Sequence, residues 1–324
     1  MREPAFWWRE AGLAAGLLAP AAACYGAIAA RRMAGAGARA GVPVLCVGNF
    51  TLGGAGKTPT ALWLAKMLKD AGERPFCLSR GYGGSLAGPK LVADVDSAAQ
   101  VGDEALLLAR AAPAIIARDR VAGAEAARAA GASVVVMDDG LQNASLAKDF
   151  TLSVVDGRRG IGNGCVFPAG PLRAPLAAQL ARTDALLVIG NGDPGINSDL
   201  PHFHGRLVPD AAAVAALKAR KVLAFAGIGD PEKFFATAEA AGISIARRKP
   251  FPDHHRFTAE EAAELIMQAE HGGLALLTTE KDRVRMTGEP LLAALVAKAR
   301  ALAVTLAVDE AEKLRALVLA KLRR

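Results

Sequence analysis

"NFTLGGAGKTP", residues 49–59, is the stretch that decides the fold of this chain. It follows an apolar run, VPVLCVGN at 42–49, which is typical of a buried strand in a parallel sheet. It precedes residues 58–72, whose apolar positions have helical spacing. A strand, a glycine-rich loop and a helix form the context that a phosphate-binding P-loop requires. The sequence therefore predicts a nucleotide site made by Thr51, Leu52, Gly53, Gly54, Ala55, Gly56, Lys57 and Thr58.

Each part of this loop has an expected role. Glycines allow backbone N–H groups to turn toward an anion at the N-terminus of the following helix. Lys57 can then reach the β- and γ-phosphates, and the Thr58 hydroxyl can bind Mg²⁺. Thr51 stands where the usual pattern has its first glycine, and a side chain fits there if φ stays negative. The alternative is a glycine-rich turn in which GKT occurs by chance.

Composition restricts the class of protein. A chain of 324 residues, 52% of them hydrophobic, is long enough for two domains and a large core. Its four cysteines lack metal-site spacing, which argues against a metal or disulfide framework and for a reducing compartment. A net charge of +7 suits an anionic partner. We expect no nucleic acid, because no basic run is interleaved with aromatic residues.

Further apolar runs alternate with helical segments between residues 74 and 192. The runs lie at 74–84, 111–120, 131–143, 149–157 and 183–192. This alternation predicts a P-loop NTPase-type, doubly wound, mainly parallel α/β sheet. Ligands of such sheets bind at the carboxyl ends of the strands. The P-loop is therefore expected to share one crevice with Arg80, Arg118, Asp138 and Asp139.

Two acidic pairs stand out near the expected crevice. Asp138 and Asp139 end the apolar run VVVM, which is the position of the aspartate that holds Mg²⁺ in P-loop proteins. Asp103 and Glu104 begin a helical stretch, where an aspartate is as often a simple N-cap. The sequence leaves these two interpretations of Asp103 open.

The sequence changes character after Pro201. New strand–loop–helix patterns at 221–242 and 274–286 predict a second, smaller α/β domain. Strands at 203–208 and 301–308 are expected to pair as a β-ribbon that joins the two domains. We predict an apolar arm at 1–40, a P-loop domain at 41–200, the smaller domain at 201–308 and a C-terminal helix at 309–324. Between these patterns, Asp253, His254 and His255 lie in a proline-flanked loop suited to catalysis or to a structural role.

The N-terminal arm has an uncharged stretch, residues 11–30, between Trp7–Arg9 and Arg31–Arg32. Its length permits a membrane span, but its high alanine content and Pro20 favour a helix or bent pair lying in the membrane surface. The alternative is a helical hairpin packed on the core. A secretory signal is rejected, because export would separate a nucleotide-binding loop from ATP.

Eight motifs carry a family resemblance from one end of the chain to the other. In order they are VGNFTLGGAGKTP, SRGYGG, VGDEALLLA, MDDGLQN, FPAGPLR, FAGIGDPEKFF, FPDHHRFT and TTEKDRV. Together they resemble the tetraacyldisaccharide 4′-kinases, the lipid A kinases of Gram-negative bacteria. The resemblance implies transfer of the ATP γ-phosphate, with Mg²⁺, to the 4′-hydroxyl of tetraacyldisaccharide 1-phosphate, forming the lipid IVA precursor. It also implies action at the cytoplasmic face of the inner membrane, where we expect the N-terminal arm to give peripheral or monotopic attachment.

The resemblance also implies residue roles. Lys57 and Thr58 match the phosphate and Mg²⁺ residues, and Asp138 and Asp139 match the acidic pair. Asp103 matches the general base and His254 its partner; because they fall in different predicted domains, we expect them to meet on domain closure. The residues expected on the acceptor side are Arg80, Tyr82, Glu104, Arg118 and Gln142.

Two other classes of protein remain as alternatives. One is a P-loop ATPase or GTPase that acts as a switch or metallochaperone. A GTPase should carry an NKxD motif, and TEKD at 279–282 lacks the asparagine. The other is a non-catalytic membrane-docking protein on a nucleotide-binding fold.

Overall fold

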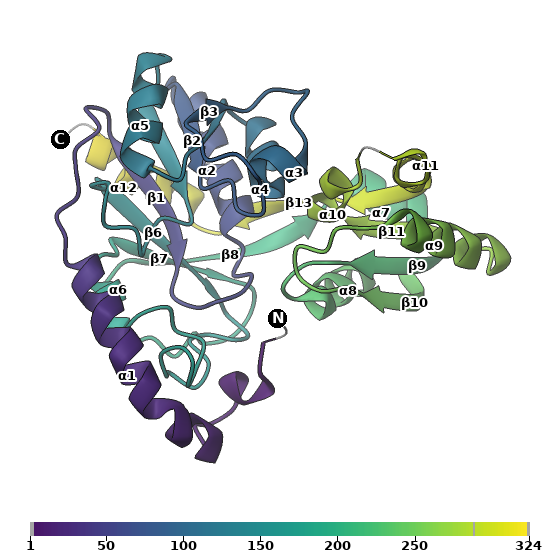
Figure 1. Cartoon of the computed structure of the whole chain (residues 1–324), viewed down its shortest axis with the longest axis horizontal. Coiled ribbons are helices and arrows are strands. Elements are labelled where there is room, and N and C mark those ends of the chain that lie inside the picture. The colour runs from purple at the N-terminus through teal and green to yellow at the C-terminus, as the bar shows by residue number, and fades with distance from the viewer. Residues whose placement is uncertain (1–2, 288, 323–324) are drawn as a thin grey trace.

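Two β-sheets organise the chain, each with helices packed on it (Figure 1). A computed structural model describes residues 3–287 and 289–322. The large sheet contains β1 (Val44–Asn49), β2 (Pro75–Ser79), β3 (Lys90–Leu91), β4 (Ala114–Ile116), β5 (Val134–Asp138), β6 (Phe150–Asp156), β7 (Ala185–Ile189), β8 (His202–Pro209) and β13 (Val304–Val308). The small sheet contains β9 (Lys221–Ala226), β10 (Ser244–Pro250), β11 (Ala275–Thr279) and β12 (Ala299–Leu302).

The large sheet is mainly parallel, in the order β13-β8-β7-β6-β1-β5-β2-β4-β3. Only the edge pairs β3–β4 and β8–β13 are antiparallel. Its central strands are apolar and buried along their length, as strands covered on both faces must be. In β1, Leu45 and Val47 pack with α2 (Lys57–Asp70) and α12 (Ala311–Leu322), whereas Val44 packs with α5 (Arg120–Ala129). The predicted doubly wound α/β fold is confirmed.

The strands β8 and β13 pair antiparallel from Gly205↔Val308 to Pro209↔Val304, as expected for the ribbon. They also belong to the edge of the large sheet, because β8 pairs parallel with β7. In Figure 1 they lead from the large sheet toward the small one. The domain boundaries at residues 40, 200 and 308 stay a prediction.

The small sheet is parallel throughout, in the order β10-β9-β11-β12. On one face, Val222 and Ala224 pack with α7 (Ala211–Leu217) and α8 (Pro231–Ala240). On the other face, Leu223 and Phe225 pack with α9 (Ala259–His271) and α11 (Pro290–Lys298). Strand β10 was not predicted from the sequence, because its ARRK segment is charged and exposed, as an edge strand can be.

Short helices position the loops that carry the expected site residues. They are α3 (Ala98–Val101), α4 (Asp103–Ala109) and α6 (Leu176–Leu180) on the large sheet and α10 (Glu280–Arg285) on the small one. Helix α10 directly follows β11, and it faces α4 where the two halves of the molecule approach each other in Figure 1.

The N-terminal arm is a short 3₁₀ turn, η1 (Ala5–Trp8), followed by one helix, α1 (Leu13–Met33). The alternative of a helical hairpin is wrong, because Pro20 lies inside this single helix. One face of α1, with Ala15, Ala22 and Met33, is buried against the body of the protein. In the part of the chain that the structure describes, α1 is the one helix long and apolar enough to cross a membrane.

Candidate active site

The P-loop joins β1 to α2 through glycines in a conformation that favours glycine. Gly53 and Gly56 have φ of +101° and +99°, and Gly56 is the N-cap of α2. A Cβ on Gly56 would lie 2.7 Å from Ile189 Cδ1, so the Ile189 side chain of β7 would have to shift to accommodate it. Thr51 is not among the described residues with positive φ, which explains how a side chain fits at the first position of the loop.

Lys57 is buried at the carboxyl ends of β1 and β5. Its Nζ donates to Asn49 Oδ1 at 3.1 Å and lies 3.7 Å from Asp139 Oδ1. Asn49 in turn donates to the Thr51 carbonyl at 2.7 Å, so it ties the lysine to the loop. Burial lowers the pKa of Lys57, while the nearby Asp139 carboxylate opposes that shift. The ammonium group is thus held in place before any phosphate binds.

Asp138 and Asp139 have opposite surroundings, although they are neighbours. Asp138 is buried at the end of β5, and neither carboxylate oxygen has a hydrogen-bond partner among the described residues. Burial, reinforced by Glu104 and Asp139, raises the pKa of Asp138 to about 7. Asp139 accepts a hydrogen bond from Arg173 Nη1 at 2.7 Å. Burial alone would raise its pKa, but Lys57 and Arg173 outweigh burial and hold it at about 2.

Asp138 and Thr58 are suited to hold a Mg²⁺ ion. Asp138 is a buried carboxylate that the protein leaves without partners, and the buried Thr58 lies at the start of α2. No group of three histidine, cysteine or acidic side chains in the described ranges could hold a metal by itself. Mg²⁺ at phosphate sites typically uses one or two protein ligands together with phosphate oxygens and water, so two ligands suffice.

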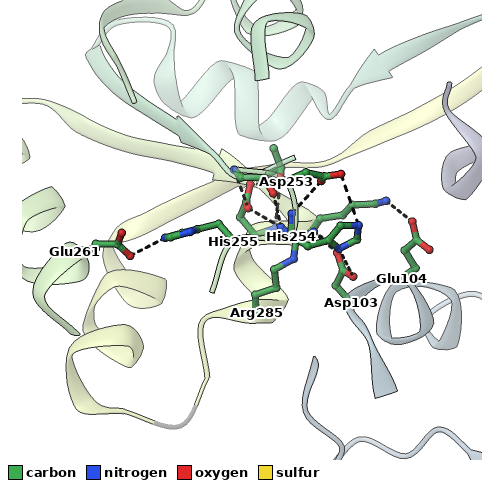
Figure 2. Close-up of polar contacts among 11 residues, drawn as sticks. Asp103, Glu104, Asp253, His254, His255, Glu261 and Arg285 are labelled. Carbon is green, nitrogen blue, oxygen red and sulfur yellow. Dashed lines mark hydrogen bonds and ion pairs between the residues drawn. The ribbon is translucent and has the colours of Figure 1, made fainter. Parts of the chain in front are cut away.

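Asp103 lies at the point where α4 meets α10 (Figure 2). Its Oδ2 accepts a short hydrogen bond from Arg285 Nη2, and its Oδ1 lies 3.4 Å from His254 Nδ1. The N-cap of α4 is Gly102, and no side chain caps the helix. The N-cap interpretation of Asp103 is therefore wrong. Asp103 and His254, expected to meet on domain closure, already lie together here.

A second ion pair lies beside the first. Lys281 Nζ donates to Glu104 Oε1 at 2.8 Å, again joining α10 to α4. Lys281 lowers the pKa of Glu104. Burial acts to raise the pKa of Asp103, but His254, Arg285 and Lys281 together hold it well below its usual range. We call the set Asp103, Glu104, His254, Lys281 and Arg285 the α4–α10 junction.

The two adjacent histidines do different things. His254 has a φ of +54°, and its ring centroid lies 4.8 Å from that of Tyr82. His255 points away from the junction toward Glu261 (Figure 2), with 2.7 Å between Nε2 and Oε2. Its ring stacks on Phe251. Asp139 and His254 are the only described non-glycine residues with positive φ. Such strained conformations tend to gather at functional sites, and both lie here.

The residues expected on the acceptor side differ in what they contact. Arg80 and Arg118 are exposed, and in the described ranges their side chains make no hydrogen bond or ion pair. Tyr82 is 58% exposed beside His254. Gln142, in contrast, donates to the Asn49 carbonyl at 2.8 Å and to Gln179 Oε1 at 2.7 Å. Gln142 therefore braces the end of β1, and its contact with an acceptor stays a prediction.

Several site residues were not identified from the sequence. Asn49 and Arg173 hold Lys57 and Asp139, and Arg285 holds Asp103. Arg173 and Arg285 are in or next to the FPAGPLR and TTEKDRV motifs, which was the only sequence signal for them. Their partners lie 34 and 182 residues away, and only the tertiary fold brings them together.

Helix α8, which packs on the small sheet, and the residues just before it contact the large-sheet half of the molecule near the P-loop. Lys233 of α8 pairs with Asp156 at 2.5 Å, and Asp230 pairs with Arg158 at 2.5 Å. Between these pairs and the P-loop lies Gly229, where a Cβ would come within 3.7 Å of the Gly54 nitrogen. The halves of the molecule thus meet at two places, with the P-loop next to one and Asp103 at the other.

Comparisons with known proteins point to one family over nearly the whole length of the chain. The family described as tetraacyldisaccharide-1-P 4′-kinase matches residues 14–323. A tetraacyldisaccharide 4′-kinase of Methylobacterium sp. (strain 4-46) is 57% identical over 332 residues, covering 100% of this chain and 98% of the relative. One of Rhodopseudomonas palustris (strain BisB5) is 54% identical with the same coverage. A crystal structure of LpxK from Aquifex aeolicus in complex with ATP has a TM-score of 0.76 and 28% identity, covering 95% of this chain and 99% of that one.

Proposed function

The chain belongs to the tetraacyldisaccharide-1-phosphate 4′-kinase family, and we propose that it transfers the γ-phosphate of ATP to the 4′-hydroxyl of tetraacyldisaccharide 1-phosphate. The protein is thus a kinase of lipid A biosynthesis, as are its curated relatives. We further propose that Asp103 is the general base, with His254 as its partner, and that the product is lipid IVA.

The chemistry follows from the side chains at the two meeting places. The 4′-oxygen attacks the γ-phosphorus, and a new O–P bond forms. The bond from that phosphorus to the β–γ bridging oxygen breaks, and ADP leaves with the electron pair. The hydroxyl proton passes to Asp103, which His254 Nδ1 orients from 3.4 Å. Lys57 stabilises the charge on the transferred phosphoryl group.

Mg²⁺ belongs on the unpartnered side of the cleft in this proposal. Thr58 and Asp138 would hold it, because Asp139 is already bound to Arg173 and close to Lys57. When bound, the ion neutralises charge on the phosphate oxygens. It would also supply the partner that Asp138 lacks, which accounts for an otherwise costly buried carboxylate.

The acceptor's acyl chains require the active site to lie at a membrane surface. The outer face of α1 is apolar, with Leu13 89% and Leu17 84% exposed and Ile28 exposed as well. Arg31 and Arg32 follow at the end of this helix, where they can meet lipid phosphates. Because the opposite face of α1 packs on the protein, we propose that α1 lies in the interface of the cytoplasmic leaflet, with peripheral or monotopic attachment.

One observation carries the proposal: a buried aspartate lies 3.4 Å from a histidine, and the next residue, Glu104, is close enough to Lys57 of the P-loop to affect its pKa. Radiolabelled phosphate transfer from ATP to purified tetraacyldisaccharide 1-phosphate tests it. We expect transfer by the wild type and a loss of about 10²–10⁴-fold in kcat for Asp103→Asn. ATP hydrolysis that is unchanged by the acceptor would instead favour a P-loop switch, and no nucleotide turnover would favour a membrane-docking protein.

A further inference from the structure

Arg285 makes several contacts around Asp103 that have no role in the reaction proposed above. Its side chain is only 5% exposed. Nη2 donates to Asp103 Oδ2, and Nη1 donates to the Gly227 carbonyl at 2.6 Å and to Asp282 Oδ1 at 3.1 Å. The same Nη2 lies 3.4 Å from His254 Nδ1. One guanidinium therefore touches both members of the proposed base pair.

The support behind Arg285 comes entirely from the small-sheet half of the molecule. Asp282 is fully buried and accepts hydrogen bonds from the Gly227 nitrogen at 3.0 Å and from the Thr279 hydroxyl at 2.6 Å. Asp282 thus fixes the start of α10 and the loop after β9 as well as the arginine. A planar guanidinium held from one side presents its remaining N–H group in a fixed direction. That direction is toward Asp103.

We propose that Arg285 is a positioning residue for the phosphoryl transfer: it fixes the Asp103 carboxylate against His254, and it keeps that carboxylate ionised only when α10 contacts α4. This inference rests on the proposed role of Asp103 as the base. Without Arg285, Asp103 would be a buried carboxylate with the nearby charge of Lys281 and, among the described residues, His254 as its closest remaining side-chain partner, and it could rotate away from the acceptor. The contact thereby ties base formation to the meeting of the two halves.

The charges around Asp103 make the idea testable by pH. From α10 it faces Arg285, Lys281 and the buried Asp282, from the 251–258 loop it faces His254, and beside it on α4 is Glu104. Removing the arginine leaves the carboxylate less stabilised, so its pKa must rise. The acidic limb of kcat then moves to higher pH. A purely structural role for Arg285 would lower the amount of folded enzyme but would not move this limb.

The test compares Arg285→Gln and Arg285→Lys with a matched control, Arg110→Gln. Arg110 also joins α4 to α10, through Glu280 at 3.1 Å, but it is half-exposed and does not contact Asp103. We measure kcat from pH 4 to 9, KM for both substrates and ATP affinity by calorimetry. The pKa of Asp103 in the wild type lies below this range, so an acidic limb from Asp103 should enter the range only when Arg285 is removed. We expect Arg285→Gln to lower kcat by about 10- to 100-fold, to keep ATP affinity within about twofold and to move the acidic limb upward.

The remaining variants separate the possible causes. Arg285→Lys keeps the charge, so its acidic limb should stay near that of the wild type even if kcat falls; it also decides the question if Arg285→Gln does not fold. Arg110→Gln should match the wild type throughout. The proposal would be overturned if Arg285→Gln kept the wild-type kcat and the wild-type acidic limb. It would also be overturned if Arg285→Gln and Arg285→Lys lost equal activity and neither shifted the acidic limb of kcat. If Asp103→Asn itself keeps full kcat, the role of Asp103 fails and this inference fails with it; if only Arg285→Gln is neutral, this inference alone fails.

Discussion

Asp103 and Asp138 are both buried carboxylates of one cleft, yet the protein treats them in opposite ways. Asp103 has Arg285 on one oxygen and His254 near the other, and its pKa lies well below its usual range. Asp138 has no partner among the described residues, and burial raises its pKa to about 7. Burial disfavours the charge in both cases, so the difference comes from the partners. The fold completes the surroundings of Asp103 and leaves those of Asp138 to a ligand.

The largest expected effect is at Lys57, in the P-loop. Lys57→Ala should reduce phosphate transfer by at least about 10³-fold, because it removes the cation that the loop holds for the phosphates. The fold should persist, since the lysine's described polar contacts are limited to Asn49 and Asp139. Transfer assays together with thermal melts check this. Near-wild-type transfer by a folded variant would end the P-loop interpretation.

The Asp103→Asn substitution tests the proposed role of Asp103 as the general base. We expect a loss of about 10²–10⁴-fold in kcat with ATP affinity changed little, because the P-loop contacts are intact. His254→Ala should also lower kcat, and the double variant should lose less than the product of the two single losses. Steady-state kinetics of the three variants measure this. Multiplicative losses would show that the two residues act independently.

The two carboxylates should affect stability with opposite signs. Asp103→Asn removes one of the two carboxylates that pair with the buried Arg285 and leaves Asp282, which should cost about 1.5–3 kcal/mol. Asp138→Asn removes an unpartnered charge and should stabilise the metal-free protein by up to about 4 kcal/mol at pH 8, because the pKa of Asp138 rises from 3.8 to about 7 on folding. Melting in EDTA across pH measures both.

The pH dependence follows from each pKa. The folded pKa of Asp138, about 7, exceeds its ordinary value of 3.8, so wild-type stability falls relative to Asp138→Asn as pH rises from about 4 to 7. The folded pKa of Asp103 is depressed, so its contribution is present above about 4 and is lost as pH falls below that value. If both substitutions stabilised the protein, or both destabilised it, the proposed difference between Asp103 and Asp138 would be wrong.

A smaller effect is expected away from both carboxylates. Replacing the exposed Leu13, Leu17 and Ile28 by serine should weaken binding to anionic liposomes and raise KM for the lipid acceptor several-fold. ATP affinity should not change. Buried Ala15 and Ala22 stay intact, so these variants test the surface without exposing the core, which deletion of the arm would do. Unchanged liposome binding and KM would make α1 a structural helix only.

The sequence was most informative about features that residues close together in the chain form. The P-loop, the strand-end Asp138 and the alternation of strands and helices are all readable within about fifteen residues, so the fold class was predictable. Arg285 and Arg173 were not, because each acts through a partner far away in the chain. Gln142 was grouped with the acceptor by its motif, but its amide is hydrogen-bonded to the end of β1. Edge strand β10 was missed because exposed strands need no apolar pattern.

The most direct test of the account is the Mg²⁺ dependence of phosphate transfer in two variants. Purified wild type, Asp138→Asn and Asp103→Asn are assayed with saturating ATP and acceptor over a wide range of Mg²⁺ concentration. We predict that the activity deficit of Asp138→Asn shrinks as the Mg²⁺ concentration rises, since this variant binds the ion more weakly, whereas the deficit of Asp103→Asn stays constant. Deficits that respond to Mg²⁺ in the same way in both variants would contradict the division of the cleft into a protein-completed carboxylate and a metal-completed one.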